Sequence, residues 1–277
     1  MKHAVKRCAV INDLSGFGRC SLTVAIPILS ALGIQACPLP TAILSNHTGW
    51  DEYYFEDFTD RMRDYAAHWK KLDLEFDSIY TGFLGSEQQV EAILEFVETF
   101  RKPETLVFVD PAMADHGEFY STCTKELCNK MRELVRHADI ITPNLTEACL
   151  LADVPYLGNA GRVSYEEIYA LGEALADLGP KQVIITGVKC GDLVANVVID
   201  RVRGARFVIE NPHISCEYCG TGDTFASVLC GYLTLGMNSH EALTKTSKFV
   251  AKTIEFSFEH EVPPLEGVAF EPFLKEL

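Results

Sequence analysis

The sequence predicts an α/β fold in which a mostly parallel sheet is covered on both faces by helices, giving three layers. Two observations support this fold. Short apolar runs rich in β-branched residues alternate along the chain with amphipathic stretches of helical periodicity. No Pro/Gly/Ser-rich linker, low-complexity tract or internal repeat interrupts the alternation, so we expect a single domain over residues 1–277.

The individual elements follow from this alternation. We expect strands at residues 8–11, 78–80, 106–109, 140–142 and 183–186, and helices at residues 21–32, 87–100, 124–136, 145–152 and 165–178. Residues 194–203 and 205–210 are expected to form a hairpin through Gly204, followed by a long helix from about Thr224 and another over residues 239–254.

Composition excludes several classes of function. The chain has 24 basic and 39 acidic residues and a formal net charge of −15, which makes it a poor partner for nucleic acid or an anionic membrane. We find neither a signal peptide nor a membrane span, and the ten scattered cysteines are typical of reduced thiols, so we expect a cytoplasmic protein. Cys216 and Cys219 form one CxxC without a second ligand pair, which makes metal or redox use the less favoured interpretation.

Ligands of parallel sheets bind in the loops that follow the strands. The first such loop contains Ser15, Gly16 and Gly18, and it resembles a dinucleotide fingerprint whose third glycine is replaced by Ser21. A tight turn explains both glycines, and Ser15 still contributes a hydroxyl group. The next loop, residues 44–50, carries four consecutive polar side chains that either bind a flat heterocycle or bond to one another within a turn.

Two further loops carry carboxylates. Asp110 follows the strand at 106–109 and suits Mg²⁺ or a cation-bridged phosphate, whereas a solvent-facing position is the simpler interpretation of Asp115. Asn144 and Glu147 have the spacing of a helix capping box, and capping alone can account for both. Because Asp110 and Glu147 each follow a strand end, they can also converge on one metal ion.

The most specific loop is the sequence Gly220-Thr221-Gly222-Asp223 at the start of a helix. Its glycines allow backbone N–H groups to approach an anion at the positive end of the helix dipole. Asp223 is then either an ordinary first-turn carboxylate or a base beside an anion hole, as phosphoryl transfer to a hydroxyl requires. We find neither the P-loop nor the HRD motif of the commonest kinase designs.

These motifs resemble a known family. Gly220-Thr221-Gly222-Asp223 together with Asn144-x-x-Glu147 resembles the signature pair of the ribokinase-like superfamily of small-molecule kinases. Within it, the chain resembles the vitamin B6 kinases (pyridoxal kinases) in Ser45-Asn46-His47-Thr48, Thr81-Gly82-Phe83-Leu84-Gly85-Ser86, Asp110-Pro111 and Thr142-Pro143-Asn144. The resemblance implies a ribokinase-like fold, ATP-dependent phosphorylation of a B6 vitamer and a homodimer.

The resemblance also implies roles for single residues. Asp223 would deprotonate the 5′-hydroxymethyl group, and the N–H groups of Gly220, Thr221 and Gly222 would form the anion hole. The vitamer would be bound by Ser15, His47, Thr48, Phe83 and Tyr120, and the nucleotide by Asp110, Thr142, Asn144, Glu147 and Thr186. Mg²⁺, and K⁺ as the monovalent cation, would lie near Asp110, Asp115 and Glu147. Asp115 and Tyr120 would belong to a lid.

The chain departs from the B6 kinase pattern at two points. Phe83 stands where many members have Tyr, and the segment 115–120 is short and acidic for a lid. A hydroxymethylpyrimidine kinase is a competing interpretation, although those enzymes typically have Cys at the position of Asp223 and lack the loop at 45–48. A non-catalytic B6-binding module would also account for the fold, and an NAD enzyme is a more remote possibility.

Overall fold

The computed structural model describes residues 4–160 and 163–277. It divides the chain into two compact units, each built from separate stretches of sequence. The first comprises the described residues up to Gly82, Phe100–Thr105 and Ile214–Leu277, and the second comprises Phe83–Thr99 and Leu106–His213.

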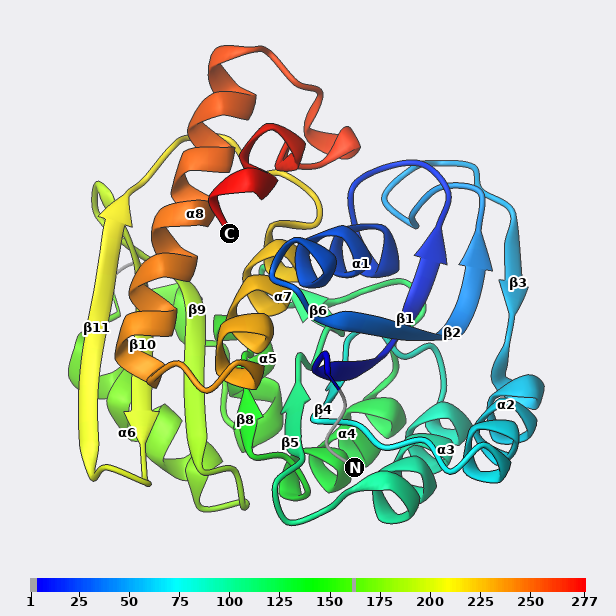
Figure 1. Cartoon of the computed structure of the whole chain (residues 1–277). Helices are drawn as coiled ribbons and strands as arrows, with labels where there is room; N and C mark the ends of the chain where they lie inside the picture. Colours follow the sequence, from blue (N-terminus) through cyan, green and yellow to red (C-terminus); the bar gives the residue numbers. More distant parts are fainter. Residues whose placement is uncertain (1–3, 161–162) are drawn as a thin grey trace. The chain divides into compact units, whose positions relative to one another are not determined.

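The first unit has a sheet in the order β4-β1-β2-β3 (Figure 1). Strand β1 (Arg7–Ser15) lies parallel to both β2 (Gln35–Leu44) and β4 (Ser78–Thr81), and β3 (Phe55–Asp57) is antiparallel to β2. Four consecutive residues of β1, Cys8–Ile11, are fully buried, as the continuous apolar run predicts for a strand covered on both faces.

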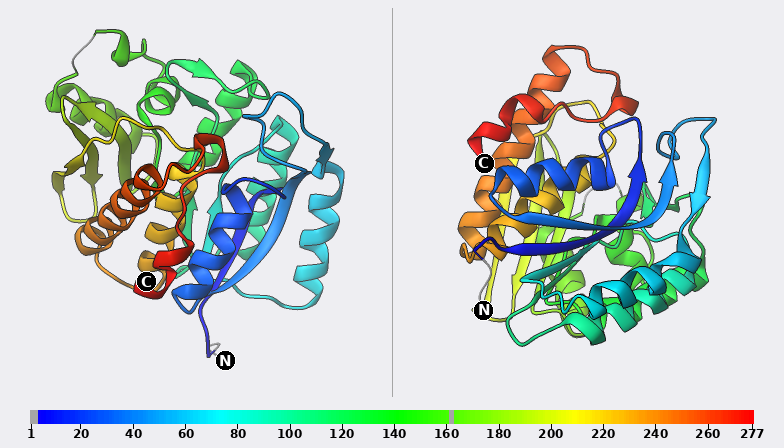
Figure 2. Two further views of the ribbon diagram at one scale, coloured as in Figure 1. Left: turned by 90° about the horizontal axis from the view of Figure 1, so that it is seen from above. Right: turned by 45° about the vertical axis from the view of Figure 1, so that its right-hand side comes forward.

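Helices cover both faces of this sheet. Figure 2 shows α1 (Ser21–Ala31) on one face and α2 (Thr59–Lys71) on the other, as right-handed crossovers from β1 to β2 and from β2 back to β4 require. Helix α7 (Thr221–Thr234) packs against α1 and against α8 (Ser239–Glu259). Gly231 permits the close contact between α7 and α1, because a Cβ there would lie 2.3 Å from Cδ1 of Leu32. Two short 3₁₀ helices, η2 (Pro264–Glu266) and η3 (Glu271–Glu276), end the chain.

The second unit has a sheet in the order β5-β8-β9-β10-β11. Strands β5 (Leu106–Val109), β8 (Ile140–Ile141) and β9 (Gln182–Cys190) are parallel, and β10 (Leu193–Asp200) and β11 (Ala205–Pro212) continue the sheet in antiparallel hairpins. Its helices are α3 (Glu87–Phe100), α4 (Lys125–Arg136), α5 (Leu145–Ala152), α6 (Tyr165–Ala176) and η1 (Leu157–Ala160), and β6 (Ala114–Asp115) and β7 (Glu118–Phe119) form a separate small hairpin. The hairpin expected through Gly204 is confirmed.

The sequence predicts no membrane span and reduced cysteines, and both predictions can be compared with the described part of the chain. No helix there is long and apolar enough to cross a membrane. All ten cysteines lie within the described residues, and none forms a disulfide.

Candidate active site

The residues singled out in the sequence lie in two groups, one in each unit. In the first unit the central element is the loop of residues 218–223, which we call the anion-hole loop. Helix α7 begins at Thr221 with Gly220 as its N-cap, three residues earlier than the sequence pattern predicts. The Gly220 carbonyl accepts hydrogen bonds from both N and Oγ1 of Thr224, each at 2.9 Å. The first N–H groups of α7 therefore have no intrahelical acceptor and can bind an anion.

Glycine is required at position 220 for two reasons. Its φ of +68° is in the left-handed region, and a Cβ there would lie 1.8 Å from the carbonyl oxygen of Arg19. Gly222 has neither constraint, since no atom lies within 4 Å of its Cβ position. The shape of the anion-hole loop thus depends on close contact with the backbone of Arg19.

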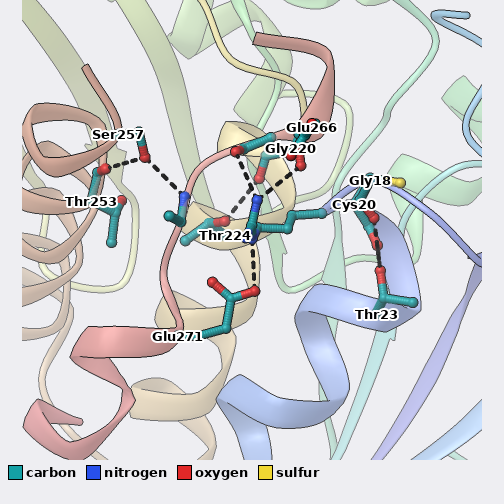
Figure 3. Close-up of polar contacts among 12 residues, drawn as sticks. Gly18, Cys20, Thr23, Gly220, Thr224, Thr253, Ser257, Glu266 and Glu271 are labelled. Atoms are coloured by element: carbon teal, nitrogen blue, oxygen red, sulfur yellow. Dashed lines mark hydrogen bonds and ion pairs between the residues drawn. The ribbon is translucent and has the colours of Figure 1, made fainter. Parts of the chain in front are cut away.

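The C-terminal segment, residues 263–271, holds this contact in place (Figure 3). The backbone N–H of Arg19 donates to Glu266 O at 2.9 Å, and its Nε donates to Oε1 of Glu271 at 2.7 Å. Cys219 N donates to Pro264 O at 3.1 Å. Hydrogen bonds and an ion pair therefore connect the loop at Arg19, the anion-hole loop and the C-terminal segment around Gly220. No local sequence motif predicts this arrangement.

Asp223, in the first turn of α7, is half-buried and contacts the start of α1 and the end of β1. Nδ2 of Asn12 donates to its Oδ1 at 3.3 Å, and the backbone N–H of Ser21 interacts with its carboxylate and lowers its pKa. Burial raises the pKa of Asp223 to about 6, and the negative charge of Asp13 adds to the rise, while the two donors oppose it. A carboxyl group with this pKa is mostly ionised at neutral pH and remains a useful proton acceptor.

The expected vitamer-binding residues of the first unit lie around the same loops. Ser15 is fully buried at the end of β1, and its hydroxyl donates to Oδ2 of Asp13 at 2.8 Å. The His47 ring is held by two backbone groups, because Nδ1 accepts from Gly49 N at 3.1 Å and Nε2 lies 2.6 Å from Leu265 O. Thr48 is half-buried beside it. The fixed His47 ring therefore helps to shape this loop.

In the second unit, Asp110 and Thr142 follow neighbouring parallel strands, as expected from the sequence. Both are buried, and Thr142 Oγ1 donates to Asp110 Oδ1 at 3.2 Å. Thr186 lies in β9, where its N–H donates to Pro143 O and it forms a bridge with Asn144. The structure therefore brings these four nucleotide-site candidates to one end of the sheet of this unit.

Asn144 and Glu147 form a reciprocal capping box at the start of α5. Oε2 of Glu147 accepts from Asn144 N at 2.9 Å, and Oε1 accepts from Met113 N at 3.0 Å. Burial raises the pKa of Glu147 well above its usual value, and the nearby charge of Asp110 raises it further. Glu147 thus fixes the backbone beyond β5 in addition to capping α5.

The remaining candidates of this unit surround the β6–β7 hairpin. Asp115 is exposed in β6, and Tyr120, 39% exposed, follows β7 with its N–H on Met113 O. The turn between the two strands is bonded to α5 through Gly117 N and Thr146 Oγ1 at 2.9 Å. Phe83 is half-buried at the start of the unit. The short acidic segment expected as a lid is therefore a bonded hairpin.

Within the described residues, no cluster of three His, Cys, Asp or Glu side chains could hold a metal ion. Asp110 and Glu147 are nevertheless both buried, and the charge of Asp110 raises the pKa of Glu147; a cation beside them would favour the ionised form of Glu147. Sequence reasoning missed Asn12, Asp13 and Ser21 as partners of the candidate base, and it missed the C-terminal segment.

Known proteins resemble this chain over most of its length. A family model described as phosphomethylpyrimidine kinase matches residues 26–266. A pyridoxal kinase from Rubrobacter xylanophilus is 27% identical over 270 residues, covering 94% of this chain and 90% of that protein.

Two solved structures extend over almost the whole chain. One comes from Bacteroides thetaiotaomicron, is provisionally described as a phosphomethylpyrimidine kinase and was crystallised with pyridoxal. It is 41% identical to this chain and has a TM-score of 0.94. The match covers 98% of this chain and 95% of that one. Pyridoxal kinase from Lactobacillus plantarum is 28% identical, with a TM-score of 0.89 and coverage of 99% and 96%.

These comparisons confirm the α/β fold class and the resemblance to the B6 kinases. The chain therefore belongs to the phosphomethylpyrimidine kinase family and is a kinase of the ribokinase-like superfamily.

Proposed function

We propose that this chain transfers the γ-phosphoryl group of ATP to the 5′-hydroxymethyl group of a B6 vitamer, namely pyridoxal, pyridoxine or pyridoxamine. The observation that carries the proposal is the position of Asp223. Its carboxylate lies in the first turn of α7, beside N–H groups that have no intrahelical acceptor, and it has a pKa of about 6. A base and an anion hole on adjacent residues suit transfer of a phosphoryl group to an alcohol.

In the proposed step, Asp223 accepts the proton of the 5′-hydroxyl as the oxygen attacks the γ-phosphorus. The new O–P bond forms while the bond to the β-phosphate oxygen breaks, and ADP leaves. The N–H groups of Gly220, Thr221 and Gly222 stabilise the charge on the moving phosphoryl group. Ser15, His47 and Thr48 would bind and orient the vitamer, and the resemblance to the B6 kinases assigns the same role to Phe83 and Tyr120.

The second unit would hold the nucleotide. Asp110, Thr142, Asn144 and Thr186 lie at one end of its sheet, and Asp110 and Glu147 would offer carboxylate oxygens to Mg²⁺. Asp115 of β6 is exposed and would be a third ligand only in the bound state. When bound, Mg²⁺ neutralises phosphate charge, which this chain of net charge −15 cannot do with a P-loop lysine. We further propose that K⁺ assists Mg²⁺ in neutralising the phosphate charge. The protein would form a homodimer and act in the cytoplasm, with residues 1–277 as one domain.

A substrate panel tests the proposed reaction. Purified protein with Mg-ATP should convert pyridoxal, pyridoxine or pyridoxamine to the 5′-phosphate with release of one ADP per product, as followed by mass spectrometry. Hydroxymethylpyrimidine belongs in the same panel, because the family model is described as a phosphomethylpyrimidine kinase and the two pyrimidines are chemically related. Phosphorylation of the pyrimidine alone would favour a role in thiamine synthesis, and tight pyridoxal binding without ATP consumption would favour a binding module.

Metal dependence forms a second expectation. Excess chelator should lower turnover by at least about 10²-fold, because the phosphate charge is then no longer neutralised. Asp110→Asn should raise the Mg²⁺ concentration needed for half-maximal rate, whereas Glu126→Gln, on the exposed first turn of α4, should leave it unchanged. Turnover that persists in chelator would contradict a metal-assisted transfer.

A further inference from the structure

The buried carboxylate of Asp13 interacts with the candidate base and has no role in the reaction as proposed above. Only 6% of Asp13 is exposed. Its two oxygens accept hydrogen bonds from hydroxyl groups, Oδ1 from Ser21 Oγ at 2.5 Å and Oδ2 from Ser15 Oγ at 2.8 Å. Burying a carboxylate costs free energy unless its oxygens accept hydrogen bonds. Because both Asp13 oxygens need their donors, the hydroxyl groups of Ser15 and Ser21 are held in fixed positions.

Ser21 connects Asp13 to Asp223. It is the first residue of α1 and has a φ of +52°, a left-handed conformation that is unfavourable for a residue other than glycine. Its N-cap, Cys20, makes no side-chain cap, so the Ser21 N–H has no partner within its own helix. That N–H instead interacts with the Asp223 carboxylate and lowers its pKa. The hydroxyl bond to Asp13 holds Ser21 in the conformation that makes this contact.

Asn12 is a second partner of Asp223, and it is bonded to the backbone of Asp13 rather than to the Asp13 carboxylate. Its Oδ1 accepts from the backbone N–H of Asp13 at 3.0 Å, which leaves Nδ2 to donate to Asp223 Oδ1 at 3.3 Å. The register between β1 and β2 shifts between Asn12 and Leu14. Strand β1 is therefore irregular at the position of Asn12 and Asp13. Asn12 is fully buried, and a Cβ on Gly82 would lie 2.2 Å from its Nδ2, so its amide is packed firmly.

We propose that Asp13 is a positioning residue for Asp223: its carboxylate holds the Ser21 hydroxyl, and thereby directs the Ser21 N–H towards the carboxylate that accepts the substrate proton. This inference rests on the proposed function, in which Asp223 is the base. Asp13 itself touches neither the hydroxyl group nor the phosphoryl group in this scheme. A shift of about 1 Å in a reacting group can cost about 10²-fold in rate, so the position of Asp223 matters for turnover.

Asp13 also acts on Asp223 electrostatically. The ionisable groups that interact with Asp223 are Asp13 from β1, His47 after β2, Cys20 before α1 and Cys219 before α7. The charge of Asp13 raises the pKa of Asp223, whereas the N–H of Ser21 lowers it. The activity should fall at acidic pH as Asp223 becomes protonated, which is the acidic limb of the rate profile. Removing the Asp13 charge should move this fall to lower pH, and removing the Ser21 N–H contact should move it to higher pH.

Three variants test this proposal, with kcat measured per folded molecule from pH 5 to 9. In the wild type, activity should fall as the pH drops below about 6, because protonated Asp223 cannot accept a proton. Asp13→Ala should lower kcat by about 10- to 100-fold even at pH 8. Asp13→Asn keeps the shape and an acceptor oxygen, so it should recover most of that kcat, with the limb moved to lower pH. Ser21→Ala should lower kcat, with the limb moved to higher pH.

Asp223→Asn, measured alone and combined with Asp13→Ala, separates this proposal from the proposed function. Asp13→Ala should cost nothing further in the double variant, because no base is left to position. If Asp13→Ala lowers only thermal stability, with kcat per folded molecule and the pH limb unchanged, Asp13 is structural and the positioning role is wrong. Should Asp223→Asn itself retain wild-type turnover, the proposed base fails and the positioning role fails with it. If Asp13→Ala does not fold, Ser21→Ala decides, because an unchanged kcat and an unchanged pH profile in that variant would contradict the positioning role.

Discussion

Replacing Asp223 by asparagine should lower kcat for B6 vitamer phosphorylation by about 10²- to 10⁴-fold, the usual contribution of a general base. The amide cannot accept the hydroxyl proton, yet it has nearly the shape of the carboxyl group, and its oxygen can still accept the bond from Asn12 Nδ2. Nucleotide affinity should therefore stay close to that of the wild type. Steady-state kinetics with pyridoxal and titration calorimetry with ATP measure the two quantities separately.

Asp64→Asn is the matched control for this experiment. It is the same chemical change on the exposed surface of α2 in the same unit, so kcat should not change. If Asp223→Asn binds both substrates and still turns over at the wild-type rate, Asp223 is not the base.

Replacing Gly220 by alanine should damage both the fold and the reaction. The φ of +68° costs an alanine about 1–2 kcal/mol, and its Cβ would approach Arg19 O to 1.8 Å, so the anion-hole loop must move. Loss of a well-placed anion-hole donor typically costs about 10²- to 10³-fold in kcat. We therefore expect a lower Tm by thermal unfolding and a kcat reduced by that factor in the folded fraction.

Gly222→Ala is the matched control for Gly220→Ala. It lies two residues further along the same loop, with open space at its Cβ position and no left-handed φ. Its Tm should equal that of the wild type. A similar loss of Tm in both variants would contradict the special role of the Arg19 contact.

Much of the architecture could be predicted because it depends on local patterns. The continuous apolar run at Cys8–Ile11 becomes the buried core of β1, and β5, α3 and α5 have the bounds that the sequence predicts. Three kinds of element were missed. Strand β2 contains Pro38 and Pro40, α2 buries only Met62 among its thirteen residues, and β6 and β7 have two residues each. None of these segments has the periodicity on which sequence reasoning depends.

The candidate site shows the same division between local and long-range features. The sequence Gly220–Asp223 is recognisable because a helix N-terminus and its glycines are adjacent in the chain. The partners of Asp223 are not recognisable in this way, since Asn12 is 211 residues away and looks like the end of an ordinary strand. The ion pair of Arg19 with Glu271 joins residues 252 positions apart. The capping interpretation of Asn144 and Glu147 is confirmed, although their role toward a metal stays a prediction.

A single-turnover experiment tests the central claim most directly. Enzyme in excess over pyridoxal, with saturating Mg-ATP, is quenched at short times, and pyridoxal 5′-phosphate is measured by mass spectrometry for the wild type and for Asp223→Asn. This experiment isolates the transfer step from product release. We predict one phosphorylated product per pyridoxal in the wild type, and a transfer rate lower by about 10²- to 10⁴-fold in the variant despite intact binding of both substrates. Equal transfer rates in the two proteins, or no transfer to pyridoxal in the wild type, would contradict the claim.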